Sequence, residues 1–333
     1  MGFLFGGRAK GGGLALVGDI GGTNARFGLV DLSAARPEVS DATGYQCRDF
    51  ASAADAVRTY LRERGVKRVP AAAAIAVAGP VENGAIRFTN NDWSLSEAGL
   101  REMGFGAARL LNDYAALALA APLLQGEDVR RIGAPDAEPG NRTIAVLGPG
   151  TGFGVSAVAR DDRGEAILAT EGGHIAFAPV DEVEIEVLRR LAAKYGRVSV
   201  ERILSGPGIV DLHRALLAVD GRESVLADPA EITRRALSGD PECRRTLERF
   251  CAILGSVAGD FALAYGARGG VYVAGGIPPI VIDVLASSAF RKRFEDKGRF
   301  AAYLAQIPTR VILRPHAALL GAADAARSLV GAG

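Results

Sequence analysis

The chain has 333 residues, of which 49% are hydrophobic and 23% are charged, and its formal net charge is +1. This length allows two domains, the composition is typical of a globular protein, and the near-zero charge argues against a nucleic-acid partner. No apolar run approaches the roughly 18–20 residues that a membrane span needs, so no membrane partner is expected. Three scattered cysteines without a Cys-x-x-Cys pair exclude a disulfide framework and favour a reducing, cytoplasmic compartment.

The chain starts with a glycine-rich stretch and then enters a hairpin pattern. Residues 1–13 lack the apolar region and cleavage site of a signal peptide and are expected to form a disordered leader. Leu14–Val17 and Arg26–Val30 predict two strands. Between them, the pair Gly21-Gly22 allows backbone N–H groups to face outward, and with the Thr23 hydroxyl they can form a concavity for phosphate oxygens.

Asp19 lies just before this glycine turn. A carboxylate beside a phosphate would be repelled unless Mg²⁺ lay between them, so Asp19 favours a metal–nucleotide site over a bare anion site. We expect Asp19 to contact the metal through a water molecule. The structural alternative is a tight hairpin with an exposed aspartate.

The next hundred residues alternate between strand and helix patterns. The predicted strands are Val39–Phe50, Ala71–Ala78 and Arg109–Leu111, and the predicted helices are Ser52–Arg64, Glu97–Met103 and Tyr114–Ala121. Asn112-Asp113 follows the last of these strands at its carboxyl end, where ligands gather in α/β sheets. A carboxylate there, at the start of a helix, is well placed to stay ionised. The alternative is that Asp113 only caps the helix.

A second strand–glycine–strand pattern follows a polar stretch, Gln125–Arg142, which is expected to be a linker. Thr143–Leu147 predicts a strand, Gly148–Gly154 a glycine-rich turn, and Val155–Val158 a returning strand. Because this pattern aligns with the first hairpin, we infer a structural duplication with one phosphate loop in each half. The second loop has no counterpart to Asp19. The spacing matches neither a dinucleotide-binding fingerprint nor a P-loop.

Two further segments carry candidate polar ligands. Glu171 and His174 are separated by two glycines, a turn that can bring both side chains to one small target such as a sugar with hydroxyl groups. The three histidines are not paired at metal-ligand spacing, which makes a zinc site unexpected, and a structural role for His174 is the alternative. Glu201, taken alone, is typical of a solvated helix residue.

The C-terminal part of the chain is mainly helical. Helices are expected over Asp181–Tyr195, Ile209–Val219, Pro229–Leu237 and Pro241–Ala267, a solvated helix and loop over Phe290–Phe300, and a late strand over Ile307–Leu313. A buried strand, Gly270–Ala274, runs into Gly275 and Gly276, which would let a flat base or a ribose approach the backbone; an ordinary strand-to-helix turn is the alternative. The small-residue helix Ala317–Val330 is expected to return to the N-terminal half.

Taken in order, eight motifs resemble the bacterial glucokinase family of the hexokinase/actin-like superfamily. They are GDIGGTNAR, AVAGPVENG, LNDYAALA, LGPGTGFGV, EGGHIAFAP, VSVERILSGPGIV, GGVYVAGGI and FEDKGRF. The resemblance runs from Leu16 to about Leu320. It implies an α/β protein of two domains with the actin-like/hexokinase-like (ribonuclease H-like) fold and an interdomain cleft. The expected small domain is 14–124 plus 315–333, and the expected large domain is 125–314.

The resemblance also implies the activity: transfer of phosphate from ATP with Mg²⁺ to the 6-hydroxyl of D-glucose, the first step of glycolysis. It assigns Asp113 as the catalytic base and Asn112, Glu171, His174 and Glu201 as sugar ligands. The nucleotide ligands that it implies are Gly18, Asp19, Ile20, Gly21, Gly22 and Thr23 in the first phosphate segment, Gly150, Thr151 and Gly152 in the second, and Gly275 and Gly276 in the adenosine segment. Tyr114, where the family often has Phe, and the leader are the departures, and neither touches the chemistry.

Three other functions remain open from the sequence. One is a kinase of another hexose or an N-acetylhexosamine on the same fold. Another is a non-catalytic sugar sensor, although the 13 residues before the first strand are too few for a helix-turn-helix. The third is an actin-like filament protein, against which the retained Asp113 and the Glu/His cluster argue. A homodimer is a family expectation, and polyphosphate as an additional donor stays open.

Overall fold

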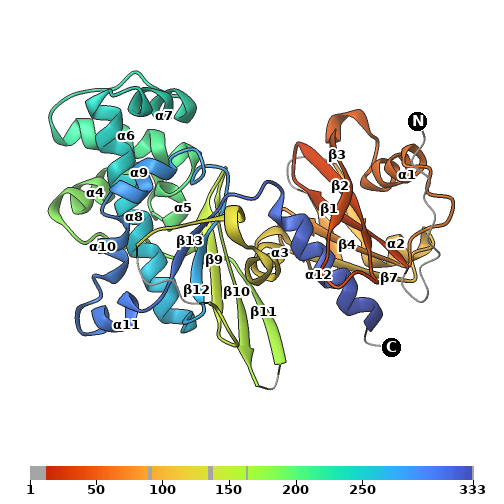
Figure 1. The fold of residues 1–333 in the computed structure, drawn as a ribbon. Coiled ribbons are helices and arrows are strands. Elements are labelled where there is room, and N and C mark those ends of the chain that lie inside the picture. The colour runs from red at the N-terminus through yellow and green to blue at the C-terminus, as the bar shows by residue number, and fades with distance from the viewer. Residues whose placement is uncertain (1–12, 89–91, 134–137, 163, 332–333) are drawn as a thin grey trace. The chain divides into compact units, whose positions relative to one another are not determined.

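The computed structural model describes residues 13–88, 92–133, 138–162 and 164–331. It divides into two compact units: unit 1 takes the chain up to Leu123 together with the part from Pro315 onward, and unit 2 runs from Leu124 to Arg314 (Figure 1). In these described ranges we find no helix that combines the length and the apolarity required to traverse a membrane.

Unit 1 is built on a five-stranded mixed sheet in the order β3-β2-β1-β4-β7. Its strands are β1 (Leu14–Ile20), β2 (Asn24–Asp31), β3 (Val39–Gln46), β4 (Ala72–Val77) and β7 (Ala107–Asn112). The first three form antiparallel pairs, whereas β4 runs parallel to β1 and β7 runs parallel to β4. Every residue of β4 is buried, as its continuous apolar run predicts. The predicted third strand is shorter than expected because a 3₁₀ turn starts at Cys47.

The described part of unit 1 contains four α-helices, and the first two begin at serine caps. They are α1 (Ala53–Glu63), α2 (Glu97–Glu102), α3 (Asp113–Ala120) and α12 (Ala317–Gly331), and a small hairpin of β5 (Ala85–Arg87) and β6 (Ser94–Ser96) lies between α1 and α2. Ser52 caps α1 and Ser96 caps α2, each by accepting a backbone N–H with its hydroxyl. The predicted positions of both helix starts are therefore confirmed.

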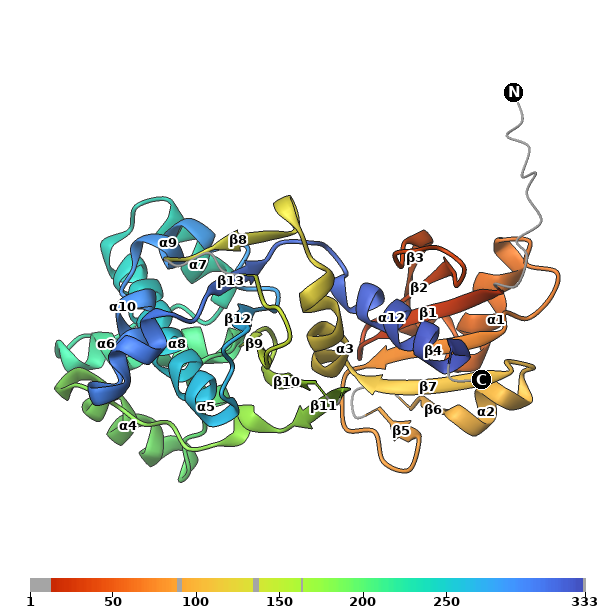
Figure 2. The same ribbon diagram turned by 60° about the horizontal axis from the view of Figure 1, so that its bottom comes forward.

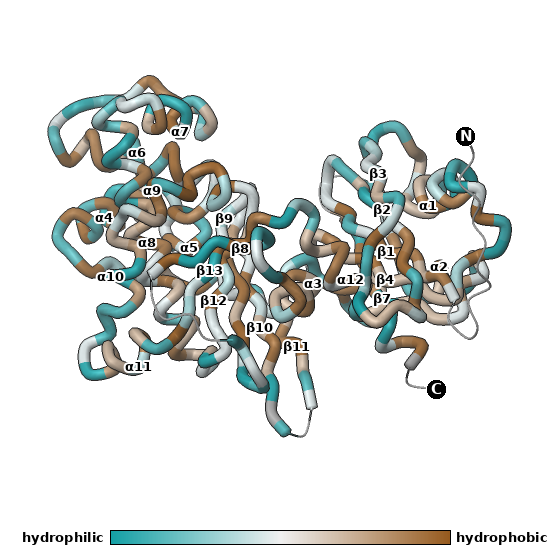
Figure 3. Tube along the Cα trace, in the orientation of Figure 1, coloured by the Kyte–Doolittle hydropathy of each residue, from teal (hydrophilic) through white to brown (hydrophobic). Residues whose placement is uncertain are grey.

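Helix α12 returns to unit 1, where it packs against α3 and β4. It is largely hydrophobic along its length (Figure 3). Gly321 lies so close to α3 that a Cβ atom built on it would be 1.7 Å from the carbonyl oxygen of Ala116. Because α3 starts at Asp113, this close approach helps to set the position of that residue.

Unit 2 contains a six-stranded sheet in the order β11-β10-β9-β12-β13-β8. Its strands are β8 (Val129–Arg131), β9 (Ile144–Pro149), β10 (Phe153–Asp161), β11 (Gly164–Thr170), β12 (Gly270–Val273) and β13 (Thr309–Ile312). The prediction that 125–142 is a linker is wrong in part, because β8 lies inside it and pairs with β13. Strand β8 has three residues, two of them arginines, and so shows no alternation of apolar and polar residues. The sequence therefore did not predict this edge strand.

Five strands of unit 2, all except the edge strand β8, repeat the order and directions of the unit 1 sheet, as the inferred duplication predicts (Figures 1 and 2). Strand β9 takes the place of β1, and β10, β11, β12 and β13 take those of β2, β3, β4 and β7. The first phosphate-loop candidate thus joins β1 to β2, and the second joins β9 to β10, which is the equivalent antiparallel pair of its own sheet.

Eight α-helices lie in the described part of unit 2. They are α4 (Glu182–Tyr195), α5 (Val200–Ile203), α6 (Gly206–Val219), α7 (Pro229–Leu237), α8 (Pro241–Tyr265), α9 (Ile282–Ser287), α10 (Phe290–Glu295) and α11 (Ala301–Ala305). The prediction of a solvated helix and loop over Phe290–Phe300 is wrong in part: a helix does start at Phe290, but Phe290 and Phe294 are fully buried and α10 packs on α8. Because three charged residues separate the two phenylalanines, the sequence did not indicate that this apolar pair, spaced by one helical turn, would share a buried face.

Candidate active site

The carboxyl ends of three parallel strands meet at one edge of the unit 1 sheet. Ile20 at the end of β1 is in register with Val77 of β4, which is in register with Asn112 at the end of β7. Neighbouring strands lie about 4.8 Å apart, so Ile20 and Asn112 are separated by roughly 9–10 Å across this edge. The first glycine turn and the Asn112-Asp113 pair are therefore neighbours within unit 1.

The first phosphate-loop candidate is tied to the sheet by backbone hydrogen bonds. The Gly21 N–H donates to the Asn24 carbonyl (2.9 Å), and the Cys47 N–H donates to the Thr23 carbonyl (2.8 Å). The Ala78 N–H donates to the Ile20 carbonyl (3.0 Å), which joins the loop to the end of β4. These bonds hold the turn in a defined shape before any ligand binds.

Asp19 is half-buried in β1 and faces Arg26 of β2 in the hairpin register. Burial raises the pKa of Asp19, and the charges of Arg26 and His316 lower it in part. The described residues include no cluster of three or more His, Cys, Asp or Glu side chains that could hold a metal. A single carboxylate nevertheless fits Mg²⁺, which keeps several waters and is held in kinases by one or two carboxylates and the substrate phosphates.

Asn112, and not Asp113, caps α3. The Asn112 Oδ1 accepts the N–H groups of Tyr114 (3.0 Å) and Ala115 (3.3 Å), and its Nδ2 donates to the Gly79 carbonyl (3.4 Å). Asp113 is the first residue of the helix and is half-buried; its Oδ1 accepts the Tyr114 N–H at 2.9 Å. Asp113 is thus not the N-cap of α3, although its carboxylate accepts an N–H group of the first turn.

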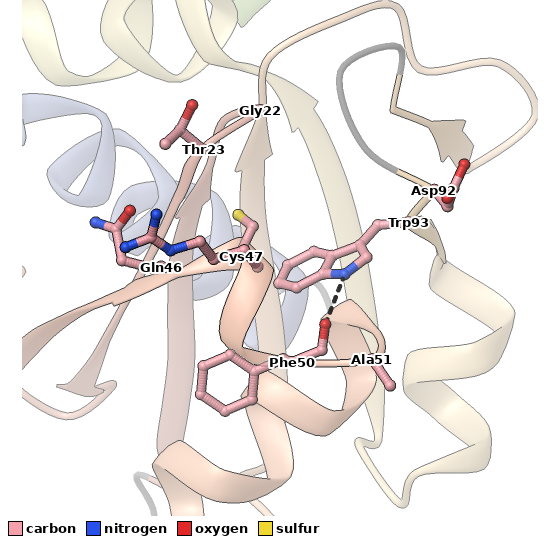
Figure 4. A pocket seen from close by; sticks show the side chains of 9 residues that line it. Gly22, Thr23, Gln46, Cys47, Phe50, Ala51, Asp92 and Trp93 are labelled. Carbon is pink, nitrogen blue, oxygen red and sulfur yellow. Dashed lines mark hydrogen bonds between the residues drawn. The ribbon is translucent and has the colours of Figure 1, made fainter.

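A pocket of about 350 Å³ opens beside the first loop in unit 1 (Figure 4). Its lining includes Gly22, Thr23, Gln46, Cys47, Phe50 and Trp93. The Trp93 indole N–H donates to the Phe50 carbonyl at 3.3 Å, which fixes the ring as one wall. Thr23, a candidate phosphate ligand, therefore borders open space on this side of the loop.

In unit 2 the second phosphate-loop candidate lies against the candidate adenosine segment. The Gly150 N–H donates to the Gly152 carbonyl (2.8 Å), which closes the turn around Thr151. A Cβ on Gly148 would overlap the carbonyl of Ala274, and a Cβ on Gly150 would lie 3.9 Å from the N of Gly276. The loop and Gly275-Gly276 consequently share one surface, and only glycine fits at position 148.

The sugar-ligand candidates of unit 2 are joined by backbone bonds. Glu171 precedes a 3₁₀ turn that ends at His174, and the His174 Nε2 is 3.9 Å from the Glu171 Oε2; both side chains are more than half exposed. The Val200 N–H donates to the Ile175 carbonyl (2.9 Å), so the segment that carries Glu201 pairs with the segment that follows His174. Glu171, His174 and Glu201 thus come from two bonded segments.

The structure therefore groups the predicted residues into two sets. Unit 1 holds the first phosphate segment with Asn112 and Asp113, and unit 2 holds the second phosphate loop, the adenosine segment, Glu171, His174 and Glu201. Arg26 and His316, whose charges act on Asp19, were missed by sequence reasoning. His316 adopts a positive φ of 54°, a conformation that nothing in its sequence neighbourhood indicates.

Comparison with known proteins defines the class. The structure matches a glucokinase crystal structure from an Antarctic psychrotroph with a TM-score of 0.88 and 38% identity, covering 95% of this chain and 99% of that one. It also shares its fold with a ROK hexokinase from Thermus thermophilus (TM-score 0.64, 21% identity, covering 96% of this chain and 100% of that one). The chain thus has the hexokinase-like α/β fold built on two mixed sheets.

The sequence comparisons then give the family. The profile of the family described as Glucokinase matches residues 16–329. A glucokinase from Caulobacter sp. (strain K31) is 54% identical over 314 residues, which cover 94% of this chain and 95% of the relative. The chain belongs to the glucokinase family and is an enzyme of the glucokinase class. The family resemblance drawn from the eight motifs is confirmed.

Proposed function

We propose that this chain transfers the γ-phosphoryl group of ATP to the 6-hydroxyl of D-glucose, giving glucose 6-phosphate and ADP. The observation that carries the proposal is the cluster in unit 2, where Glu171, His174 and Glu201 lie on bonded segments and Glu201 reaches the second phosphate loop. Carboxylates and an imidazole both suit hydroxyl groups that donate and accept hydrogen bonds. A polyol site next to a phosphate site is what a sugar kinase needs.

In this mechanism, Asn112, Glu171, His174 and Glu201 hold the sugar. Asp113 accepts the proton of the 6-hydroxyl as that oxygen attacks the γ-phosphorus, and the bond from the γ-phosphorus to the bridging oxygen of ADP breaks. The transition state of phosphoryl transfer is loose and rich in charge, so most of the catalysis comes from positioning and electrostatics. The proposal requires the Asp113 edge of unit 1 and the Glu171 segment of unit 2 to reach the same glucose.

The two glycine loops supply the nucleotide contacts in this proposal. Backbone N–H groups within 18–23 and within the turn 150–152, with the hydroxyls of Thr23 and Thr151, would bind phosphate oxygens, and Gly275-Gly276 would lie against the adenosine. Asp19 would hold Mg²⁺ through water, and the bound ion would neutralise charge on the β and γ oxygens. We further propose that the two units act as two domains, that the enzyme works in the cytoplasm, and that it forms a homodimer.

Initial rates with a sugar panel test the proposal. ADP formation is measured for glucose, mannose, fructose, N-acetylglucosamine and N-acetylmannosamine, with ATP and separately with polyphosphate. We expect the kcat/KM for glucose with ATP to exceed that for every other sugar by at least tenfold. A higher kcat/KM for an N-acetylated sugar than for glucose would make that sugar the substrate. The absence of turnover with every sugar would favour the sugar-sensor alternative.

Changing Glu171 to glutamine or His174 to alanine should weaken glucose binding far more than ATP binding. Glu171→Gln removes the charge from an acceptor and His174→Ala removes a hydrogen-bond partner of a sugar hydroxyl; a hydrogen bond to a charged group contributes about 1.5–3 kcal/mol. We expect the KM for glucose to rise at least tenfold and the KM for ATP to change less than threefold. Equal increases in both KM values would move this pair out of the sugar site.

Asp19→Asn should raise the Mg²⁺ concentration that half-saturates the reaction. Asparagine has nearly the same size but carries no charge, so the attraction of a hydrated divalent ion is lost while Arg26 remains nearby. The measurement is a Mg²⁺ titration of the rate at a fixed concentration of free ATP. Asp31→Asn, at an exposed strand end of the same hairpin, is the matched control and should leave the titration unchanged. The same titration curve for both variants would end the metal role of Asp19.

A further inference from the structure

The Glu201 carboxylate contacts the backbone of the second phosphate loop directly. Its Oε2 accepts the N–H of Phe153 at 2.9 Å, and Phe153 lies within the glycine-rich segment 148–154 as the first residue of β10. A Cβ built on Gly152 would lie 2.4 Å from the same oxygen, so the carboxylate lies directly against the loop in space that a larger residue would take. A hydrogen bond from an amide to an ionised carboxylate is stronger than a neutral one.

The segment around Glu201 is also fixed by backbone bonds on both sides. On one side, the Phe177 N–H donates to the Val198 carbonyl (3.0 Å) and the Val200 N–H donates to the Ile175 carbonyl (2.9 Å). On the other side, the Gly206 N–H donates to the Gly150 carbonyl (2.9 Å). The short helix α5 is therefore hydrogen-bonded through its flanking residues to the segment that follows His174 on one side and to the phosphate loop on the other.

A carboxylate has two oxygens, and the two can serve different partners. One oxygen of Glu201 accepts the Phe153 N–H. The other can accept a hydrogen bond from a sugar hydroxyl if Glu201 is a sugar ligand, as in the proposed function. Glu201 is half-buried, so a bound sugar would restrict its side chain further. An ordered Glu201 holds the Phe153 N–H, and hence the end of the phosphate loop, in one position.

We propose that Glu201 is a positioning residue that couples the two substrate sites of unit 2, so that glucose tightens nucleotide binding through the Glu201–Phe153 hydrogen bond. This inference rests on the proposed function and adds to it a specific route for cooperativity. Binding linkage is reciprocal, so the nucleotide tightens glucose binding by the same factor. Within the residues that the structure describes, the Glu171 carboxylate lies near His174 and makes no such bond to the loop, so Glu171 serves as the matched sugar ligand outside this route.

The test measures the dissociation constant of Mg²⁺–AMP-PNP by titration calorimetry, without sugar and with saturating glucose. The coupling ratio is the first constant divided by the second. For the unchanged protein we expect a ratio of about 5 or more, as in typical linked sites. In Glu171→Gln the glucose constant should rise at least tenfold, whereas the ratio at saturating glucose should stay within a factor of two of the original.

Two changes break the proposed route in different ways. Glu201→Ala removes both contacts, and the ratio should fall at least threefold even where glucose is raised to saturate the variant. Gly152→Ala adds a methyl group where the Glu201 carboxylate lies but keeps the Glu201 side chain, so the ratio should fall similarly. Circular dichroism and the melting temperature establish that each variant is folded; if Glu201→Ala is not, Gly152→Ala alone decides.

The outcomes separate this inference from the proposed function. A ratio of about one in the unchanged protein, or a ratio kept in both Glu201→Ala and Gly152→Ala, would overturn the coupling role. A glucose constant that is unchanged by Glu201→Ala without nucleotide would instead overturn its role as a sugar ligand, and the coupling proposal would fall with it. A lower ratio in Glu171→Gln as well would assign the coupling to the sugar site as a whole and not to Glu201.

Discussion

Replacing Asp113 by alanine is expected to lower kcat by about three orders of magnitude while glucose still binds. A general base contributes roughly 10²- to 10⁴-fold to a rate, and phosphoryl transfer leaves few other covalent tasks for the protein. Asn112 is the N-cap of α3, so the helix keeps its cap when Asp113 is replaced. Steady-state kinetics give kcat, and calorimetry gives the glucose dissociation constant.

The matched control for this change is Asp49→Ala. Asp49 is an exposed aspartate of the same unit, outside the strand edge that carries Asn112 and Asp113. It should leave kcat within about twofold. A near-normal kcat for Asp113→Ala would remove Asp113 from the base role, and a loss of glucose binding as large as the loss of kcat would make it mainly a sugar ligand.

Gly321→Ala is expected to destabilise unit 1 and to slow catalysis together. The added methyl group would lie 1.7 Å from the Ala116 carbonyl oxygen, so α12 must move away from α3. Overpacking of this kind costs about 1–3 kcal/mol, which exceeds the gain of up to about 1 kcal/mol that alanine brings to a helix. Because Ala116 follows Asp113 by three residues on α3, the shift should also misplace the base; about 1 Å can cost roughly 10²-fold.

Urea unfolding and kcat are the two readouts for this variant. Ser328→Ala is a control on the same helix, at an exposed position, and should change the unfolding free energy by less than about 0.5 kcal/mol. If Gly321→Ala were as stable and as active as the unchanged protein, the close packing of α12 on α3 would not be what positions Asp113.

Much of the fold could be predicted because local patterns agree with the final packing. Ser52 and Ser96 cap their helices, the apolar run in β4 is buried on both faces, and the repeated glycine loops sit in two sheets of the same topology. The errors lie where tertiary contacts override local pattern. Strand β8 has two arginines in three residues and exists because β13 offers it an edge.

The candidate site was only partly predictable for a related reason. Glycine turns and carboxylates that follow strands can be read directly from the sequence. The contacts between these segments cannot, because they depend on register and close approach between distant parts of the chain. The placement of Arg26 opposite Asp19 follows from the hairpin register, and the Glu201–Phe153 bond joins residues 48 positions apart. The first contact lies within one predicted hairpin and needs only its register, whereas the second has no local signature.

The central claim is that Asp113 deprotonates a sugar hydroxyl while two glycine loops hold the triphosphate. The most direct measurement is a crystal structure of the enzyme with glucose and AMP-PNP bound together. We expect an Asp113 carboxylate oxygen within about 2.6–3.2 Å of the 6-hydroxyl oxygen, and phosphate oxygens on N–H groups of both loops. A 6-hydroxyl with a different acceptor, or a triphosphate that contacts neither loop, would contradict it.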